Sequence, residues 1–256
     1  MSILKTLSIA SMTIEESLRK KIFYILLFLS LILVAFSSFF TSFGLGAQVT
    51  IMKDLSLFGI SFFGLLFTIS LFMNAVPGEI ENRTIYPILA QPITRATYLW
   101  GKFLGIYSLI AVNLFVLGLE LMVVLFPHEN SWNFEVLKAV VLIILQCGLI
   151  GAFMMLFSLI SSYPLAISAT LFLFMVGNIS YAYMGYLQAK LPPLFWSFLR
   201  YFKILLPKFD VFNIKNAVVH GHALIPGYML TAIAYGVAYL VAVMMITLII
   251  FEKKDL

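Results

Sequence analysis

The amino-acid sequence predicts an all-α membrane protein, with six transmembrane helices in a single domain over residues 1–256. Of its 256 residues, 62% are hydrophobic and 11% are charged, whereas soluble domains are about half apolar and a quarter charged. Six apolar stretches reach the roughly 20 residues that a helix needs to cross a bilayer. Glu120 is the only Asp, Glu, Lys or Arg inside any of them.

Short polar or proline-containing segments separate the six spans. The fourth and fifth share a charge-free region, residues 139–189, which is too long for one span. Pro164 divides it, because proline disfavours a helical conformation in the residue before it. We expect the spans at Ile22–Phe40, Leu55–Val76, Phe103–Phe126, Ala139–Ile160, Leu165–Leu187 and Tyr228–Phe251.

The distribution of basic residues predicts that both termini are cytoplasmic, in a multi-pass protein of the cell membrane. Short cytoplasmic segments of membrane proteins carry an excess of Lys and Arg. With a cytoplasmic N-terminus, the only Lys or Arg residues in the outer loops before residue 188 are Lys53 and Lys138. The outer segment 188–227 is an exception, because it carries five Lys or Arg residues. The cytoplasmic segments carry nine: Lys5, Arg19, Lys20, Lys21, Arg83, Arg95, Lys102, Lys253 and Lys254.

Three shorter helices are expected outside the spans. Residues 3–21 repeat apolar side chains at spacings of three and four, which predicts an amphipathic helix on the cytoplasmic surface. Residues 194–206 are aromatic and basic but too short to span, so we expect an interfacial or re-entrant helix, either as an anchor or as an external gate. A second short helix is expected near Val211–His220, before span six.

The longest predicted cytoplasmic connection, residues 77–102, contains a polar motif. Its acids Glu79 and Glu81 suit the first turn of a short helix, where they offset the positive end of the helix dipole. Pro92 ends this helix, and Thr94 and Arg95 lead into span three. Such a helix between two spans suits the docking of a soluble partner; the alternative is a lipid-surface helix without one.

The motif resembles one in the membrane subunits of ABC type-2 transporters, mostly exporters. That family has an acidic residue, Thr, a hydrophobic run, x-Pro-Ile-Ser/Thr-Arg and Gly-Lys after its second span. This chain reads Glu79-Ile-Glu81-Asn-Arg-Thr84, then Gln-Pro92-Ile-Thr94-Arg95, and then Gly101-Lys102. Arg83 replaces a common glycine, as in members linked to multi-copper enzyme maturation that this chain resembles.

The resemblance implies a permease subunit that pairs with a second copy or a paralogue around a translocation pathway. It also implies a coupling helix that docks a separate cytoplasmic ATPase. The chain has no phosphate-binding loop, so we expect no catalytic residue and no cofactor here, with ATP and Mg²⁺ bound by the partner. The expected ATPase contacts are Glu79, Glu81, Arg83, Thr84, Pro92 and Arg95.

Four polar residues inside the spans are candidates for the pathway or for contacts between helices. A charged carboxyl at the bilayer centre costs about 2.5–3.5 kcal/mol. Glu120 therefore suggests a helix contact, a substrate contact or a proton site, unless its carboxyl lies near the outer interface. The other three candidates are the amides Asn113, Gln146 and Asn178. Amide side chains inside spans mostly form hydrogen bonds with other helices.

The sequence gives less support to a metal-binding protein, a nucleic-acid-binding protein, an enzyme or a scaffold. His128, His220 and His222 lie in outer segments, and no metal site is expected from their spacing. No basic cluster suits nucleic acid. An intramembrane enzyme is less favoured, because no paired aspartates or His-Glu-x-x-His motif lie in the spans. A non-transporting assembly or scaffold protein is the remaining alternative, and no residue indicates the transported substrate.

Overall fold

The computed structural model describes residues 2–37, 39, 48–73, 75, 78–79, 93–178, 192, 197, 207–222 and 225–253. Every regular element within them is a helix, which confirms the all-α class. Four of these helices are long and apolar enough to cross a membrane. They are α3 (Gln48–Met73), α6 (Arg95–Glu129), α7 (Phe134–Ile160) and α12 (Tyr228–Lys253).

Two shorter apolar helices, α2 (Lys21–Phe36) and α8 (Tyr163–Gly177), overlap the other two predicted spans. Residues 38, 40 and 179–187, which the prediction also included, lie outside the described residues. The predicted break between spans four and five is present, since α7 ends at Ile160 and α8 begins at Tyr163. Pro164 lies in the first turn of α8, where its missing N–H has no intrahelical partner to lose.

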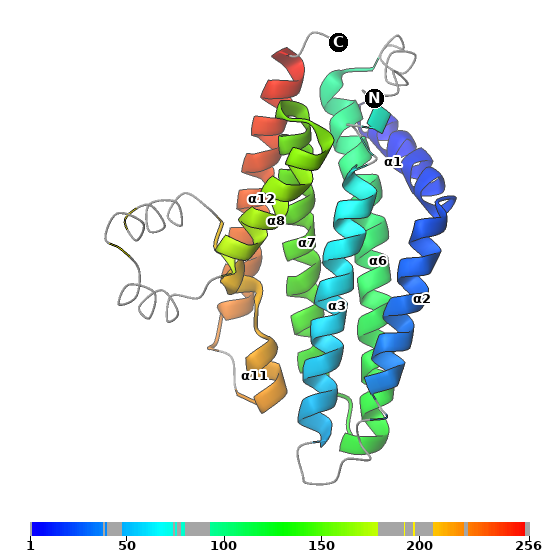
Figure 1. Cartoon of the computed structure of the whole chain (residues 1–256), viewed down its shortest axis with the longest axis vertical. Helices are drawn as coiled ribbons and strands as arrows, with labels where there is room; N and C mark the ends of the chain where they lie inside the picture. The colour runs from blue at the N-terminus through cyan, green and yellow to red at the C-terminus, as the bar shows by residue number, and fades with distance from the viewer. Residues whose placement is uncertain are drawn as a thin grey trace.

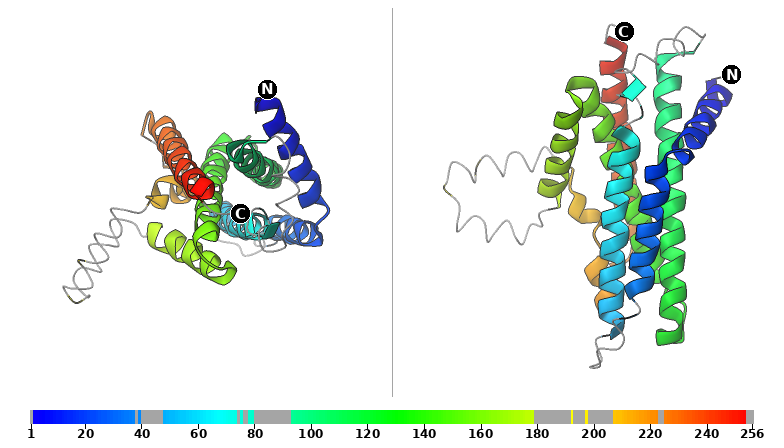
Figure 2. Two further views of the ribbon diagram at one scale, coloured as in Figure 1. Left: turned by 90° about the horizontal axis from the view of Figure 1, so that it is seen from above. Right: turned by 45° about the vertical axis from the view of Figure 1, so that its right-hand side comes forward.

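Helix α7 lies at the centre of the bundle. It packs against α3, α6, α8 and α12 (Figure 1). In its most apolar 18-residue window, 78% of the residues are buried, against 28% in α12. In the view along the bundle, α12 and α2 lie on opposite sides (Figure 2). Helix α7 is therefore the core, and α12 presents most of its surface outward.

Helix α1 (Ser2–Leu18) leans across one end of the bundle and packs on α6. Two glycines of α6 permit this approach. A Cβ at Gly105 would lie 2.7 Å from the carbonyl oxygen of Ala10, and one at Gly101 would lie 2.8 Å from the Cβ of Ile9. Small residues let backbones approach closely in this way. The helix predicted near the N-terminus is confirmed, with Ile3 and Leu4 exposed at 74% and 72%.

Several helices extend beyond the predicted spans. Helix α3 begins at Gln48 rather than Leu55, and α6 begins at Arg95 rather than Phe103. The prediction of Lys53 in a loop is wrong, because Lys53 lies within α3, where its ammonium pairs with Glu129 at the end of α6. A hydropathy run ends at the first charge, whereas a helix continues where that charge finds a partner.

The segment before α12 contains the 3₁₀ helix η2 (Phe209–Phe212) and α11 (Lys215–His220). Phe209 and Phe212 are buried, and η2 packs against α7 and α8. Gly221, with φ of 66°, ends α11 in the left-handed conformation that glycine adopts readily. The short helix expected near 211–220 is present as α11. The helix expected over 194–206 lies outside the described residues, apart from position 197.

Candidate functional site

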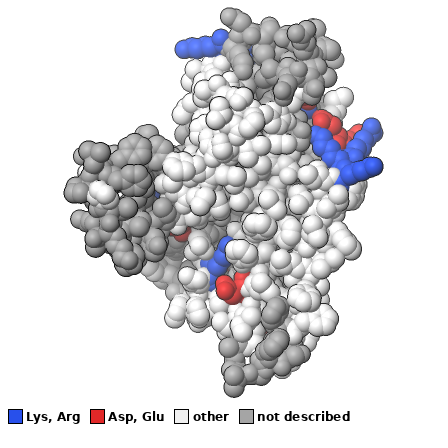
Figure 3. Space-filling view, in the orientation of Figure 1, with Lys and Arg blue, Asp and Glu red and all other residues white. Residues whose placement is uncertain are grey.

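Charged side chains gather near the two ends of the bundle. On the face seen in Figure 3, one group lies beside α1 and α2 and a smaller one near α11, with a largely uncharged band between them. We call the end that carries α1, the start of α6 and the end of α12 the terminal end, and the opposite end the distal end. Both ends hold buried ion pairs.

At the terminal end, Lys102 of α6 joins three segments of the chain. Its ammonium donates hydrogen bonds to the Glu79 carboxylate and, at 3.2 Å, to Oε2 of Glu16 in α1. The Tyr98 hydroxyl donates to the same Glu79 carboxylate. The side chain of Lys102 is 7% exposed and that of Glu79 is 13% exposed. We call Glu16, Glu79, Tyr98 and Lys102 the terminal junction.

Local sequence places these groups together. Thr94 caps the start of α6, and its hydroxyl accepts a hydrogen bond from the Thr97 amide at 3.2 Å. Residues four apart in a helix lie on the same face, so Tyr98 and Lys102 both point at Glu79. A cavity of about 270 Å³ adjoins the junction and is lined in part by Met12 and Ile93.

Glu16 lies at the exposed edge of the terminal junction, since its side chain is 47% exposed. Its carboxylate pairs with Lys20 at 3.1 Å in addition to Lys102. Burial alone would raise the pKa of this carboxyl, but the nearby ammonium groups of Lys102 and Lys20 outweigh it, so the pKa lies below its usual value of 4.5. Glu16 is therefore held in its charged form.

Arg95 ties the last turn of α12 to the start of α6. Its guanidinium donates to the carbonyl oxygens of Phe251 at 2.8 Å and Glu252 at 2.9 Å. The last carbonyls of a helix have no intrahelical donor, so Arg95 supplies one. The guanidinium also lies 5.8 Å from the Phe251 ring centre, and the Tyr98 ring stacks on that ring at 6.0 Å.

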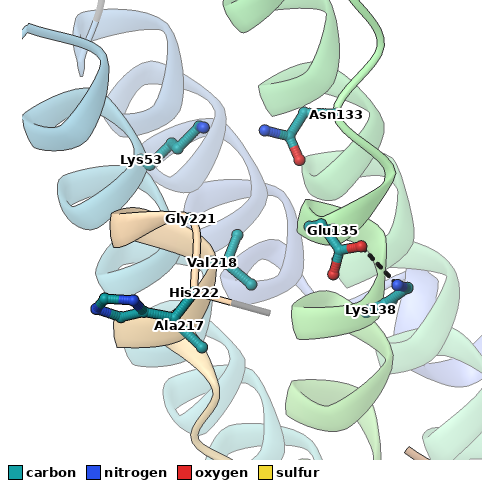
Figure 4. A pocket seen from close by; sticks show the side chains of 8 residues that line it. All are labelled: Lys53, Asn133, Glu135, Lys138, Ala217, Val218, Gly221 and His222. Carbon is teal, nitrogen blue, oxygen red and sulfur yellow. Dashed lines mark hydrogen bonds and ion pairs between the residues drawn. The ribbon is translucent and has the colours of Figure 1, made fainter. Parts of the chain in front are cut away.

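The distal end is built around a second buried ion pair, between Lys53 of α3 and Glu129 of α6. The Asn133 amide donates to the other Glu129 oxygen at 3.0 Å. Beside them lies a cavity of about 350 Å³ between α3, the start of α7 and α11. Figure 4 shows Lys53, Asn133 and His222 around it, with the exposed pair Glu135–Lys138 at 2.6 Å.

Comparison with known families decides the class of the protein. Residues 7–256 match the family model of the ABC-2 family transporter proteins. The chain belongs to this family. No curated protein matches it. As an ABC-2 permease, it is a membrane subunit of the transport machinery and not itself the catalytic one.

The predicted ATPase contacts of this ABC-2 permease divide into two groups. Glu79 and Arg95 bind partners within the chain, as described above. Glu81, Arg83, Thr84 and Pro92 lie outside the described residues. The sequence alone assigns no role to Tyr98, Lys102 or Glu16. The spacing of Tyr98 and Lys102, on one helical face directly after the motif, was the available signal.

Of the four polar residues predicted inside the helices of the permease, two bond each other and two have an oxygen without a described partner. The Gln146 amide donates to the side-chain oxygen of Asn178 at 3.4 Å, which joins α7 to the end of α8. Asn113 and Glu120 lie in α6, and each has a buried oxygen without a hydrogen-bond partner in the described part of the chain. Among the described residues, no three His, Cys, Asp or Glu side chains form a metal-binding group.

Proposed function

We propose that this chain forms one half of the translocation pathway of an ABC exporter in the cell membrane. Two copies, or this chain and a paralogue, make up the pathway, and each contacts one cytoplasmic ATPase that binds ATP and Mg²⁺. Six spans cross the bilayer: the four long helices together with the shorter apolar helices α2 and α8. The excess of basic residues in the predicted inner segments supports cytoplasmic termini. Family membership supports the transport role.

The terminal junction is the observation that supports coupling through residues 77–97. Glu79 lies near the start of this segment and Arg95 near its end. Glu79 accepts a hydrogen bond from Lys102 of α6, and Arg95 donates one to the end of α12. A displacement of the segment would therefore act on α6 and α1 through Lys102, and on α12 through Arg95. Such contacts suit a segment that transmits the closure of an ATPase pair to the spans.

The junction also separates two roles within the segment. Glu79 is largely buried against Lys102 and Tyr98, so it positions the segment. We assign contact with the ATPase to Glu81, Arg83, Thr84 and Pro92. A non-transporting assembly protein would need no such link between the segment and three helices.

The test is purification of the tagged full-length chain from membranes of its source cell. We expect a chain with a phosphate-binding loop to co-purify and to hydrolyse ATP with Mg²⁺. Glu81→Lys should reduce the recovery of this ATPase several-fold, whereas Lys138→Met, at the distal end, should leave the recovery unchanged. Recovery of membrane chains without any ATPase would favour the assembly protein.

A second measurement separates docking from coupling. In the reconstituted complex, the double variant Glu79→Gln/Lys102→Met should retain the ATPase but lose the acceleration of ATP hydrolysis that the membrane subunit confers. Loss of binding instead would assign Glu79 to the contact surface. Unchanged acceleration would remove the terminal junction from the mechanism.

A further inference from the structure

One amide in the middle of α6 has a buried oxygen that no described residue satisfies. Oδ1 of Asn113 accepts no hydrogen bond in the described part of the chain. The residue is 6% exposed and lies near the midpoint of α6 (Arg95–Glu129). The amides of Gln146 and Asn178 differ, since they bond each other. Inside a bilayer an unpaired polar group is unfavourable, so the Asn113 oxygen lacks a donor that the described chain does not supply.

Asn113 lines a cavity between α6 and α2, which we call the α2–α6 groove. Its volume is about 190 Å³, and the other described residues that line it are apolar. The wall that α2 contributes includes Phe23 and Leu27. On α6, Val112 and Val116 lie at the rim and are 63% and 48% exposed. The groove therefore opens towards the lipid.

The volume of the groove limits its occupant to a small molecule. An apolar cavity of about 150 Å³ holds a benzene molecule, whereas pockets for drug-sized ligands begin at about 300 Å³. A helix with its side chains is about 10 Å wide, so the groove cannot hold a helix of a second copy. The occupant is therefore about the size of a substituted benzene or a short alkyl chain.

The lining of the groove selects the chemistry of that small molecule. An ion would lose its hydration here, because no charged residue belongs to the described lining. A water molecule needs roughly two to four polar partners, and Asn113 is the one polar residue in the described lining. A pure hydrocarbon would leave the Asn113 oxygen without a donor. An alcohol or a phenol has both parts, an apolar body and one O–H donor.

We propose that the α2–α6 groove binds a small apolar molecule with a hydroxyl group. The hydroxyl donates a hydrogen bond to Asn113, and the apolar body packs against Phe23 and Leu27 of α2. A lipid head group cannot supply this donor, because the hydrocarbon core is about 30 Å thick and Asn113 lies near the midpoint of its helix. The site is independent of the proposed coupling, because none of its residues belongs to the terminal junction.

The experiment uses the full-length protein in phosphatidylcholine nanodiscs and an octanol probe with a diazirine in its chain. After irradiation, peptide mass spectrometry should find the label concentrated on the α2 and α6 residues of the groove. Unlabelled octanol should compete about threefold to tenfold better than octyl methyl ether at equal concentrations within the membrane, because the ether cannot donate the hydrogen bond. Equal competition by the two compounds, label spread over all lipid-facing helices, or no label at the groove would overturn the proposal.

Matched variants assign this preference to Asn113. Asn113→Leu deletes the acceptor at similar volume, so octanol should then compete no better than the ether. Because the Asn113 oxygen has no described partner to lose, the thermal midpoint of this variant should match the wild type. Asn216→Leu removes an exposed amide of α11 and should leave the preference for octanol unchanged. A preference that persists in a folded Asn113→Leu protein would refute the hydrogen bond.

A further variant tests the groove while Asn113 stays in place. Val116→Trp puts an indole ring at the exposed rim, where it covers the groove without entering the core of the bundle. Labelling of the groove by the octanol probe should fall several-fold in this variant. Labelling of a folded Val116→Trp protein at the wild-type level would refute the α2–α6 groove as the site.

Discussion

The two ends of the bundle hold similar ion pairs but use them differently. At the terminal end, one buried lysine joins residues distant in sequence, in α1, the polar segment and α6. At the distal end, Lys53 joins only α3 to α6, and Glu135–Lys138 is a local, exposed pair. A cavity adjoins each end, of about 270 Å³ at the terminal junction and about 350 Å³ at the distal pair. The difference is that the terminal end joins several segments, whereas the distal pair ties two helices.

The coupling proposed above would use the end at which one residue bonds several segments. A push on a segment bonded to three helices moves them together or breaks their contacts. At the distal end, α11 packs against α3 and α7, and its residues Ala217 and Val218 also line the cavity. On the proposed coupling, a movement at the terminal end would act on several segments at once, whereas one at the Lys53–Glu129 pair would act on α3 and α6.

The strongest test of this comparison is removal of the central lysine. Lys102→Met removes the buried ammonium that Glu79 and Glu16 share, and breaking a buried ion pair costs about 3–5 kcal/mol. We expect a large fall in the thermal midpoint of unfolding in detergent. The double variant Glu79→Gln/Lys102→Met should recover most of it, since no uncompensated charge remains. A single variant as stable as the wild type would contradict the buried joint.

The matching change at the distal end should cost less. Lys53→Met removes the cation from Glu129, but the Asn133 amide still bonds that carboxylate, which is 19% exposed. We expect a loss of about 2 kcal/mol in the free energy of unfolding, measured by the same thermal scan. If Lys53→Met destabilises the protein more than Lys102→Met, the assignment of the stronger joint to the terminal end is wrong.

Removal of the Arg95 guanidinium tests the link to α12. Arg95→Ala deletes donors to two carbonyl oxygens at the end of α12 and the contact with the Phe251 ring. We expect a loss of about 1–2 kcal/mol and faster hydrogen exchange in the last turn of α12. Arg95→Lys should restore stability only in part, because an ammonium lacks the planar fork of the guanidinium. Unchanged exchange in α12 would exclude this link.

The sequence predicted the helices better than the joints between them. Span length and charge identified all four long helices, and Pro164 marked the boundary between α7 and α8. The ends were less accurate, because Lys53 and Arg95 look like loop charges until their partners, 76 and 156 residues away, are known. Pairing over such distances leaves no local pattern in a single sequence.

The candidate site shows the same limit. The motif of residues 79–102 directed attention to the end of the bundle that holds the terminal junction, and its helical spacing places Tyr98 and Lys102 on one face. Nothing local to Glu16, in a helix that looked like a surface element, indicated that its carboxylate reaches Lys102. The close approach of α1 to α6 depends on Gly101 and Gly105, whose role is visible only when the two helices are seen together.

The smallest expected effect concerns the exposed edge of the terminal junction. The pKa of Glu16 is lower in the folded protein than its usual value of 4.5, so ionised Glu16 stabilises the fold above that value. This contribution is lost as the pH falls below 4.5 and through the folded pKa. Glu16→Gln should therefore lower the thermal midpoint slightly at pH 7, and the difference from the wild type should shrink towards pH 3.5. Glu135→Gln, whose carboxylate lies in an exposed distal pair, should show a smaller difference at pH 7. A Glu16→Gln difference that stays constant across this range would mean that Glu16 acts through packing, and that the charge at this edge of the junction is immaterial.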